Sequence, residues 1–205
     1  MIRYFTGIAF AILAVTSLPV LTAAQLPSAS SNAMTGVTTL YSRDPLGQSL
    51  CFRDGAYGSV FQDNEVRNRC SDINFNGYKA DAFTVGVEGG KEGVILNVGK
   101  PADIQKIYKY EETVGGGQGF ASLKVGDGKV WILQDRRTGT SQQFKDADAL
   151  FQKPTKENKN AAVSPGSIYL LRLTDRNDKS FELAAKLIVI SHVPGESVTF
   201  RWQVL

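Results

Sequence analysis

The chain has 205 residues, a formal net charge of +3 and 42% hydrophobic residues, which suits one domain with a substantial core. Its basic residues are spread along the sequence and form no dense basic face with interleaved aromatics, so the composition argues against nucleic-acid binding. One histidine and two cysteines cannot fill the four ligand positions of a zinc site, so no transition-metal centre is expected.

Residues 1–24 have the layout of a secretory signal peptide. Arg3 gives a positive start, residues 8–15 form a short apolar run, and residues 22–24 (Thr-Ala-Ala) supply small side chains before Gln25. The apolar run is shorter than the roughly 20 residues of a membrane-spanning helix. We therefore expect cleavage after this segment, a secreted, periplasmic or cell-surface location, and no membrane span after cleavage.

Residues 25–35 are rich in Ser, Ala and Asn without periodicity and are expected to form a flexible leader, and residues 36–205 a single β domain. The two cysteines, Cys51 and Cys70, predict a disulfide, because an even count in an oxidising compartment favours pairing. The closed loop of about 20 residues would add about 3 kcal/mol of stability. A catalytic thiol is the alternative, and it would have to stay reduced in that compartment.

Short apolar alternations predict strands in the first half of the domain. Four weaker candidates come first: Thr38–Ser42, Leu50–Arg53, Ser59–Gln62 and Ile73–Phe75. Residues 83–87 then alternate between apolar and polar side chains, and residues 94–98 do the same after a Gly-Gly turn at 89–90.

Two short helices and a hairpin are predicted in the middle of the chain. Pro101 can open the first helix and Ser141 can cap the second. The apolar positions at helical spacing are Ile104, Ile107 and Tyr108 in the first helix and Phe144, Ala147, Leu150 and Phe151 in the second. Between the helices, residues 121–125 and 130–134 flank Gly126-Asp127-Gly128, a strong hairpin signal.

The last forty residues carry the clearest pattern. Residues 167–174, 181–189 and 197–204 each predict a strand, and in the last of these Val198, Phe200, Trp202 and Val204 alternate with polar residues. Residues 193–196 (Val-Pro-Gly-Glu) fit a type II turn, and residues 175–178 form the preceding turn. Three consecutive antiparallel strands are therefore expected as a meander.

Together these elements predict an all-β, mainly antiparallel fold, a sandwich or open barrel of about ten short strands with one or two short helices. Trp131 and Trp202 lie in apolar strand runs, so both are expected in the core and not on a ligand platform.

No catalytic or metal motif is present in the sequence. There is no Gly-x-Ser-x-Gly elbow, and Ser191 precedes His192 on an alternating strand, so the two face opposite ways and cannot form a triad. The glycine run at 115–119 lacks the Lys-Ser/Thr ending of a phosphate loop. The acidic turns at 63–65 and 175–178 do not match a calcium-binding EF-hand loop. We therefore expect no catalytic residue, no cofactor and no metal ion.

Tyrosines in loops and amphipathic stretches are the weak candidates for ligand contacts. Exposed aromatic rings there could stack against sugar rings or a flat macrocycle, or could pack at a sheet edge. The candidate contact residues are Tyr57, Tyr78, Tyr108, Tyr110 and the single histidine, His192.

The order of segments resembles that of the HmuY-like secreted bacterial proteins, in which a Phe-x-x-Gly strand is followed by an Asp-Ile-x-Phe strand. Here Ser49–Gly55 contains Phe-Arg-Asp-Gly and Ser71–Phe75 contains Asp-Ile-Asn-Phe, and a glycine-broken hairpin follows. The tail has a similar succession of strands in Ile168–Arg172, Ala185–Val189 and Val198–Trp202. The resemblance covers about half of the chain at the level of layout.

The resemblance implies an all-β fold on the bacterial surface and, in some members, haem capture through paired axial histidines or methionines. After cleavage this chain offers only His192 and Met34, so no haem ligand carries over. We therefore expect a secreted bacterial β domain that acts as a non-catalytic binding or surface module for a small molecule, a glycan or a protein. The alternatives are a haem carrier and, because the sequence cannot show how far apart two carboxylates lie, a glycoside-active hydrolase.

Overall fold

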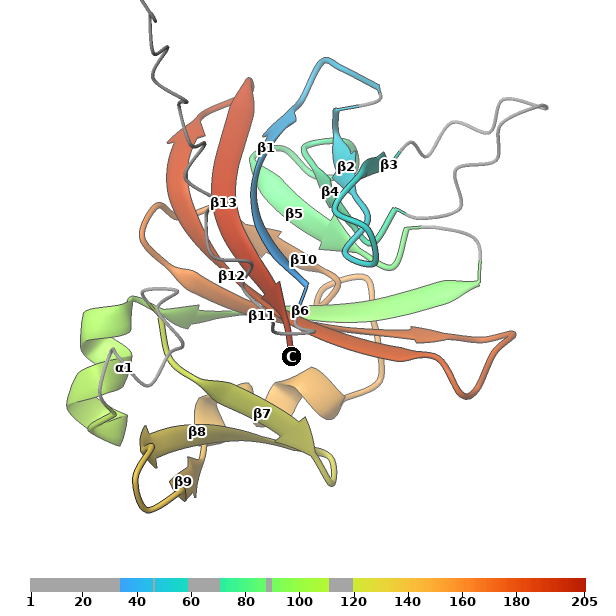
Figure 1. Ribbon diagram of the computed structural model, residues 1–205. Helices are drawn as coiled ribbons and strands as arrows, with labels where there is room; N and C mark the ends of the chain where they lie inside the picture. The colour runs from blue at the N-terminus through green and yellow to red at the C-terminus, as the bar shows by residue number, and fades with distance from the viewer. Residues whose placement is uncertain (1–33, 46, 59–70, 88–89, 111–119) are drawn as a thin grey trace, which may run out of the picture. The chain divides into compact units, whose positions relative to one another are not determined.

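The computed structural model describes residues 34–45, 47–58, 71–87, 90–110 and 120–205 (Figure 1). The chain divides into residues 1–31, which lie outside the described residues, and a unit of residues 32–205, to which every statement below refers. The expected signal peptide and most of the expected leader therefore lie outside the described part. The last residue of that leader, Thr35, already belongs to the first strand.

Three antiparallel sheets make up the described part of the chain (Figure 1). Sheet A contains, in spatial order, β1 (Thr35–Tyr41), β13 (Ser197–Val204), β12 (Glu182–Val193), β11 (Ile168–Asp175) and β6 (Lys91–Gly99). Sheet B contains β10 (Asn160–Ala162), β5 (Ala82–Val85), β4 (Ile73–Phe75), β2 (Ser49–Leu50) and β3 (Tyr57–Gly58). Sheet C contains β7 (Leu123–Gly126), β8 (Lys129–Asp135) and β9 (Thr140–Gln143), and the two helices are α1 (Pro101–Tyr108) and the 3₁₀ helix η2 (Lys145–Phe151).

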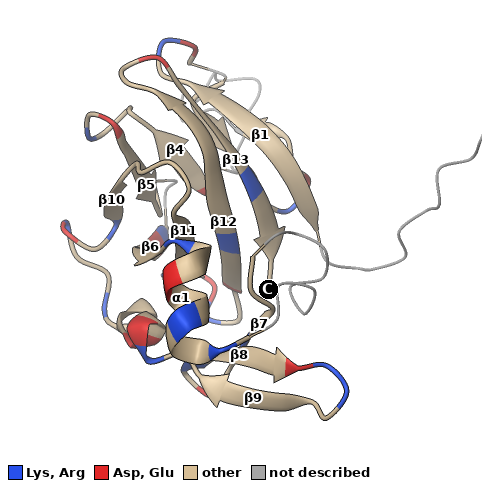
Figure 2. Ribbon diagram, turned by 90° about the vertical axis from the view of Figure 1, so that its left-hand side faces the viewer, with Lys and Arg blue, Asp and Glu red and all other residues tan. Residues whose placement is uncertain are grey.

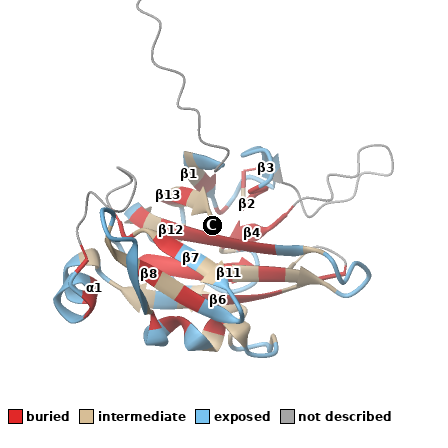
Figure 3. Cartoon of the chain, turned by 60° about the horizontal axis from the view of Figure 1, so that its bottom comes forward, coloured by how far each residue is buried: buried red, intermediate tan, exposed pale blue. Residues whose placement is uncertain are grey.

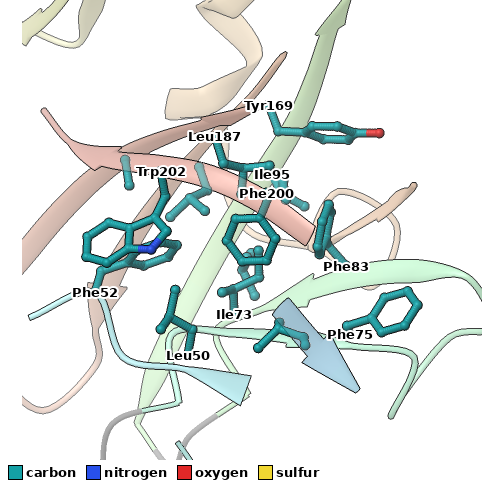
Figure 4. Close-up of a cluster of buried hydrophobic side chains, with 14 of the residues drawn as sticks. Leu50, Phe52, Ile73, Phe75, Phe83, Ile95, Tyr169, Leu187, Phe200 and Trp202 are labelled. Atoms are coloured by element: carbon teal, nitrogen blue, oxygen red, sulfur yellow. The ribbon is translucent and has the colours of Figure 1, made fainter. Parts of the chain in front are cut away.

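Sheets A and B pack face to face around an aromatic core, which we call the sandwich core. It consists of the buried apolar residues that the two sheets turn toward each other, many of them drawn in Figure 4. Phe83 of sheet B makes edge-to-face contacts with Tyr169 and Phe200 of sheet A, at ring-centroid distances of 5.4 and 5.5 Å. Phe52 meets Trp202 in the same geometry at 5.4 Å. The prediction of an all-β sandwich is confirmed.

The opposite face of sheet A forms a second core with sheet C and both helices. It joins Val94 and Leu170 of sheet A to Ile132 of sheet C, Ile104 of α1 and Leu150 of η2. Because both of its faces are covered, sheet A is the middle layer, and buried side chains continue along its central strands (Figure 3). Such two-sided burial gives nearly continuous apolar strands instead of alternating ones.

The C-terminal strands follow the predicted alternation. Val198, Phe200 and Trp202 are buried at 0%, 0% and 4% exposure, and the meander of β11, β12 and β13 is antiparallel throughout. The predicted turn is also present, because the Glu196 N–H donates to the Val193 carbonyl at 3.0 Å and Gly195 has a positive φ of 70°.

A β-bulge interrupts the register between β12 and β13. Val189 is paired with Phe200, but the next pairs join Ser191 to Thr199 and His192 to Val198, so Ile190 is the extra residue. Up to Val189 the odd-numbered side chains of β12 enter the sandwich core, and beyond the bulge His192 takes that side. The sequence pattern did not predict this change.

The hairpin between β7 and β8 is confirmed in detail. Its two loop residues are Asp127 and Gly128, with φ values of 53° and 66°. Two positive φ values in a two-residue loop are the geometry of a type I′ turn, which matches the twist of the strands it joins. This is why an Asp-Gly pair stands there.

Three predictions about local elements need correction. Residues 83–87 and 94–98 do not belong to one hairpin, because β5 lies in sheet B and β6 in sheet A. Ser141 caps no helix: it lies in β9, and η2 begins at Lys145 without a side-chain cap. The first helix is present, but Ile107 is 64% exposed on it. The predicted strand Ser59–Gln62 lies outside the described residues.

Candidate functional site

A pocket of about 540 Å³ opens where β1 ends beside the turn between β12 and β13. The described residues that line it are Tyr41, Arg43, Asp44 and Glu196. Strand alternation places Tyr41, because its neighbour Leu40 enters the sandwich core and leaves the tyrosine on the outer side, 49% exposed. The pocket therefore offers one aromatic ring, one guanidinium group and two carboxylates.

The backbone around this pocket is held from two sides. The Ser42 N–H donates to the Glu196 carbonyl at 2.8 Å, and the Ser42 hydroxyl donates to the Gly195 carbonyl. From the loop before β5, the Asp81 carboxylate accepts a hydrogen bond from the Gly195 N–H at 2.7 Å. The turn that carries Glu196 is thus fixed to both β1 and the loop before β5, and the exposed side chains stand on a rigid base.

His192 belongs to this anchoring and not to an open ligand site. Its side chain is 9% exposed, its Nε2 lies 3.2 Å from the Asp81 carboxylate, and its ring contacts Phe75 edge-to-face at 5.8 Å. The bulge at Ile190 turns it inward. Ser191 is paired with Thr199 and faces the other way, as expected, so the two residues form no triad.

Two of the candidate tyrosines are exposed. Tyr57 is 49% exposed and donates a hydrogen bond from its hydroxyl to the Thr39 carbonyl at 3.1 Å, two residues from Tyr41. Tyr57 therefore contacts β1, the strand that ends at Tyr41. Tyr78 is 52% exposed in the loop between β4 and β5, where partial burial raises the pKa of its hydroxyl.

The other two candidate tyrosines are buried, so of the two roles considered for them the structure shows packing. Tyr108 is 4% exposed, packs edge-to-face on Phe144 at 4.8 Å and donates to Asp146 at 3.2 Å. Burial raises the pKa of its hydroxyl. Tyr110 is 2% exposed, and its hydroxyl donates to the Pro101 carbonyl at 3.3 Å. Both rings anchor α1 to the second core.

Cys51 is 2% exposed at the end of β2, and the described residues include no free cysteine. Its expected partner, Cys70, lies outside the described residues. The Cys51–Cys70 disulfide therefore stays a prediction.

The remaining sites named from the sequence have ordinary structural surroundings. Asp175 and Asp178 accept hydrogen bonds from the backbone of their own turn, at Asn177 and Ser180. Trp202 is in the core, as expected, while Trp131 is only partly buried. No group of three His, Cys, Asp or Glu side chains in the described part of the chain could hold a metal ion. Residues 63–65 and 115–119 lie outside that part.

The sequence did not predict that two lysines would be buried. Lys91 forms an ion pair with Asp72, and Lys186 donates to the Ala121 carbonyl while its Nζ lies 4.4 Å from the centroid of the Phe120 ring. Lysine is seldom buried without partners. Each lysine contacts a residue that lies far from it in the sequence. Only information about long-range contacts could therefore have predicted either site.

The charged surface matches the scattered basic residues of the sequence. In the view of Figure 2, the Lys and Arg segments in blue and the Asp and Glu segments in red are dispersed over α1, the turns and single strand positions. None of the helices found among the described residues has the length and apolarity to span a bilayer. Comparison of the chain with protein-family models, curated proteins and solved structures finds no match.

Proposed function

We propose that this chain is a non-catalytic binding module of the bacterial extracytoplasmic space and that the pocket at Tyr41 binds a glycan. The observation that supports this is the lining of the pocket, which combines the half-exposed ring of Tyr41 with the charged groups of Arg43, Asp44 and Glu196. A sugar has an apolar ring face, which can stack on tyrosine, and hydroxyl groups, which can bond to carboxylates and guanidinium.

The rigid backbone beneath the pocket favours binding of this kind. The hydrogen bonds of Ser42 and Asp81 to the turn residue Gly195 hold the backbone before a ligand arrives, so less conformational entropy is lost on association. Tyr57 donates a hydrogen bond from its hydroxyl to the Thr39 carbonyl of β1, two residues before Tyr41. It therefore offers a second exposed ring beside β1. Extended oligosaccharides could contact both rings.

The test is calorimetric titration with a panel of soluble oligosaccharides, neutral, amino-bearing and carboxyl-bearing. We expect at least one to bind, and Tyr41→Ala to weaken that binding about tenfold or more, equivalent to about 1.4 kcal/mol. Tyr78→Ala is the matched control, because this tyrosine is similarly exposed but lies in the loop between β4 and β5, away from the pocket lining, and the variant should bind as the wild type does. Absence of binding to the whole panel, or equal binding by Tyr41→Ala, would contradict the proposal.

A glycoside-active hydrolase is the second candidate, because Asp44 and Glu196 line the same pocket. Both residues are exposed, however, and a glycosidase acid normally depends on a buried, apolar setting that keeps it protonated. Incubation with aryl glycosides distinguishes the two candidates. Turnover that is lost in Glu196→Gln or Asp44→Asn would establish the hydrolase, whereas binding without turnover supports the module.

A further inference from the structure

One ion pair in the described part of the chain is buried on both sides. The Lys91 Nζ lies 2.5 Å from the Asp72 Oδ1, and the two side chains are 6% and 0% exposed. In each of the other ion pairs between described residues at least one partner is more than two-fifths exposed. Asp72 directly precedes β4 in sheet B, and Lys91 begins β6 in sheet A, so the contact joins the two layers of the sandwich.

A backbone N–H and an aromatic ring are among the groups that contact this pair. The Phe52 N–H donates to the second carboxylate oxygen of Asp72 at 2.8 Å, and the Lys91 Nζ lies 5.3 Å from the centroid of the Phe181 ring. Two charges removed from water in this way carry a large desolvation cost, which even a close ion pair often fails to offset. A chemical step that removes both charges is therefore favoured here over the same step at the surface.

We propose that Lys91 and Asp72 join through an intramolecular amide bond between Nζ and Cγ. A proton first passes within the pair from the ammonium to the carboxylate, leaving a neutral amine and a neutral carboxylic acid. The amine nitrogen attacks Cγ, so the C–N bond forms and the bond from Cγ to the hydroxyl oxygen breaks. That hydroxyl leaves with one amine proton as water, and no oxidant, reductant or other reactant is needed.

The contacts place each group for this step. Since Cγ is bonded to Oδ1 at a C–O length of about 1.2 Å, it lies at most about 3.7 Å from Nζ, close to the separation of reacting atoms. The Phe52 N–H meets the Asp72 oxygen on which negative charge develops during the attack. Burial of both side chains also keeps bulk water from reversing the reaction.

Lys186 provides the matched control. It is buried at 1% exposure, more deeply than Lys91, and it also lies near a phenylalanine ring. It donates to the Ala121 backbone carbonyl, which belongs to a peptide bond and does not acylate amines at neutral pH. Loss of Lys186 should leave the cross-link unchanged.

The test is intact mass spectrometry of the whole exported chain after denaturation and reduction of any disulfide. We expect a mass one water below that of the sequence, and a proteolytic fragment in which the peptides of Asp72 and Lys91 remain joined. Lys91→Met should restore the full mass, and Lys186→Met should keep the deficit. In Asp72→Asn, formation of the same bond would release ammonia instead of water, so the mass deficit would be that of one ammonia. This difference identifies the side chain of residue 72 as the attacked group in a variant that can still form the bond.

A wild-type mass equal to that of the unmodified exported chain would overturn the proposal and leave the contact as an ion pair only. A deficit of one water without the joined fragment would overturn it as well, because an aspartate that cyclises on its own backbone loses the same mass. A joined fragment that maps to another lysine would do the same. The bond can form only in the folded chain, so the wild-type mass and the joined fragment decide the proposal, and a variant is compared only after circular dichroism shows that it folds.

Discussion

The two cores on either side of sheet A are assembled from different parts of the chain. Apart from Ile95, the sandwich core draws its buried residues from positions 40–85 and 169–202, so its two halves meet only after the chain has closed on itself. The second core uses residues 94–170, one continuous stretch with α1, sheet C and η2 in order. The sandwich core therefore depends on long-range contacts, which form slowly, whereas the second core is built from shorter connections.

Strand β11 is the element that joins the two cores. Leu171 and Leu173 point into the sandwich core, and Leu170 and Ile168 point into the second core, all at 1% exposure or less. Neither core is complete without this strand. We therefore expect one cooperative unfolding transition for residues 34–205, with the following three predictions as ways to test that expectation.

The largest effect is expected in the sandwich core, for Trp202→Ala. The indole is 4% exposed, packs on Phe52 and donates to the Thr38 hydroxyl at 3.0 Å. Loss of such a side chain costs about 3–5 kcal/mol of unfolding free energy, measured by urea denaturation. Trp131→Ala, in a partly buried position on sheet C, is the control and should cost clearly less. A loss below about 1 kcal/mol at Trp202 would show that its face is not the core.

A pair of neighbouring substitutions compares the two cores directly. Leu171→Ala and Leu170→Ala remove the same side chain from opposite faces of β11, so each should cost about 2–5 kcal/mol. Near-ultraviolet and far-ultraviolet circular dichroism should show one shared transition in both variants. If Leu170→Ala instead separates a first transition from the main one, the second core unfolds independently and the expectation of a single cooperative unit is wrong.

The smallest effect concerns a polar contact at the border of the sandwich core. The Tyr169 hydroxyl donates to the Ala162 carbonyl at 2.8 Å and accepts from the Ser164 N–H at 2.7 Å, which ties β11 to the segment after β10. Tyr169→Phe should cost about 1–3 kcal/mol at neutral pH, since two hydrogen bonds of about 0.5–1.5 kcal/mol each are lost.

The same hydroxyl gives a dependence on pH. Burial raises the pKa of Tyr169 above its usual 10. The folded protein therefore favours the neutral hydroxyl, so this contribution is complete below about pH 10 and is lost as the pH rises through the folded-state value. Urea denaturation from pH 8 upward should show a smaller alkaline decline in Tyr169→Phe than in the wild type. An identical decline would mean that the hydroxyl ionises equally in both states.

The sequence predicted those parts of the fold that local patterns determine. Period-two alternation located β13, and the Asp127-Gly128 pair located its hairpin, because each depends on neighbouring residues alone. The separation of β5 and β6 into different sheets could not be predicted, since a glycine turn fits a hairpin and a crossover between layers equally well. The burial of Tyr108 and Tyr110 could not be predicted either, because their hydrogen-bond partners come from η2 and the start of α1.

Less of the candidate site was predictable. Tyr41 lies in a predicted strand, but the sequence gives no sign that Glu196 lies beside the same pocket more than 150 positions later. The contact of Asp72 with Lys91 could not be predicted from the sequence either, since one residue lies two positions after a cysteine and the other directly after a pair of glycines. Sites of this kind arise only where the layers meet, so they depend on topology and not on motifs.

The extra residue at Ile190 shifts the side-chain alternation at the tip of the β12–β13 hairpin by one position. Deletion of this one residue would remove the bulge and leave the remaining pairs in place, Ser191 with Thr199 and His192 with Val198. His192 would then still face Phe75 and Asp81, and the turn bearing Glu196 would stay attached to the loop before β5. Homologous hairpins that preserve the pocket should therefore be able to lack this residue, whatever their side chains are.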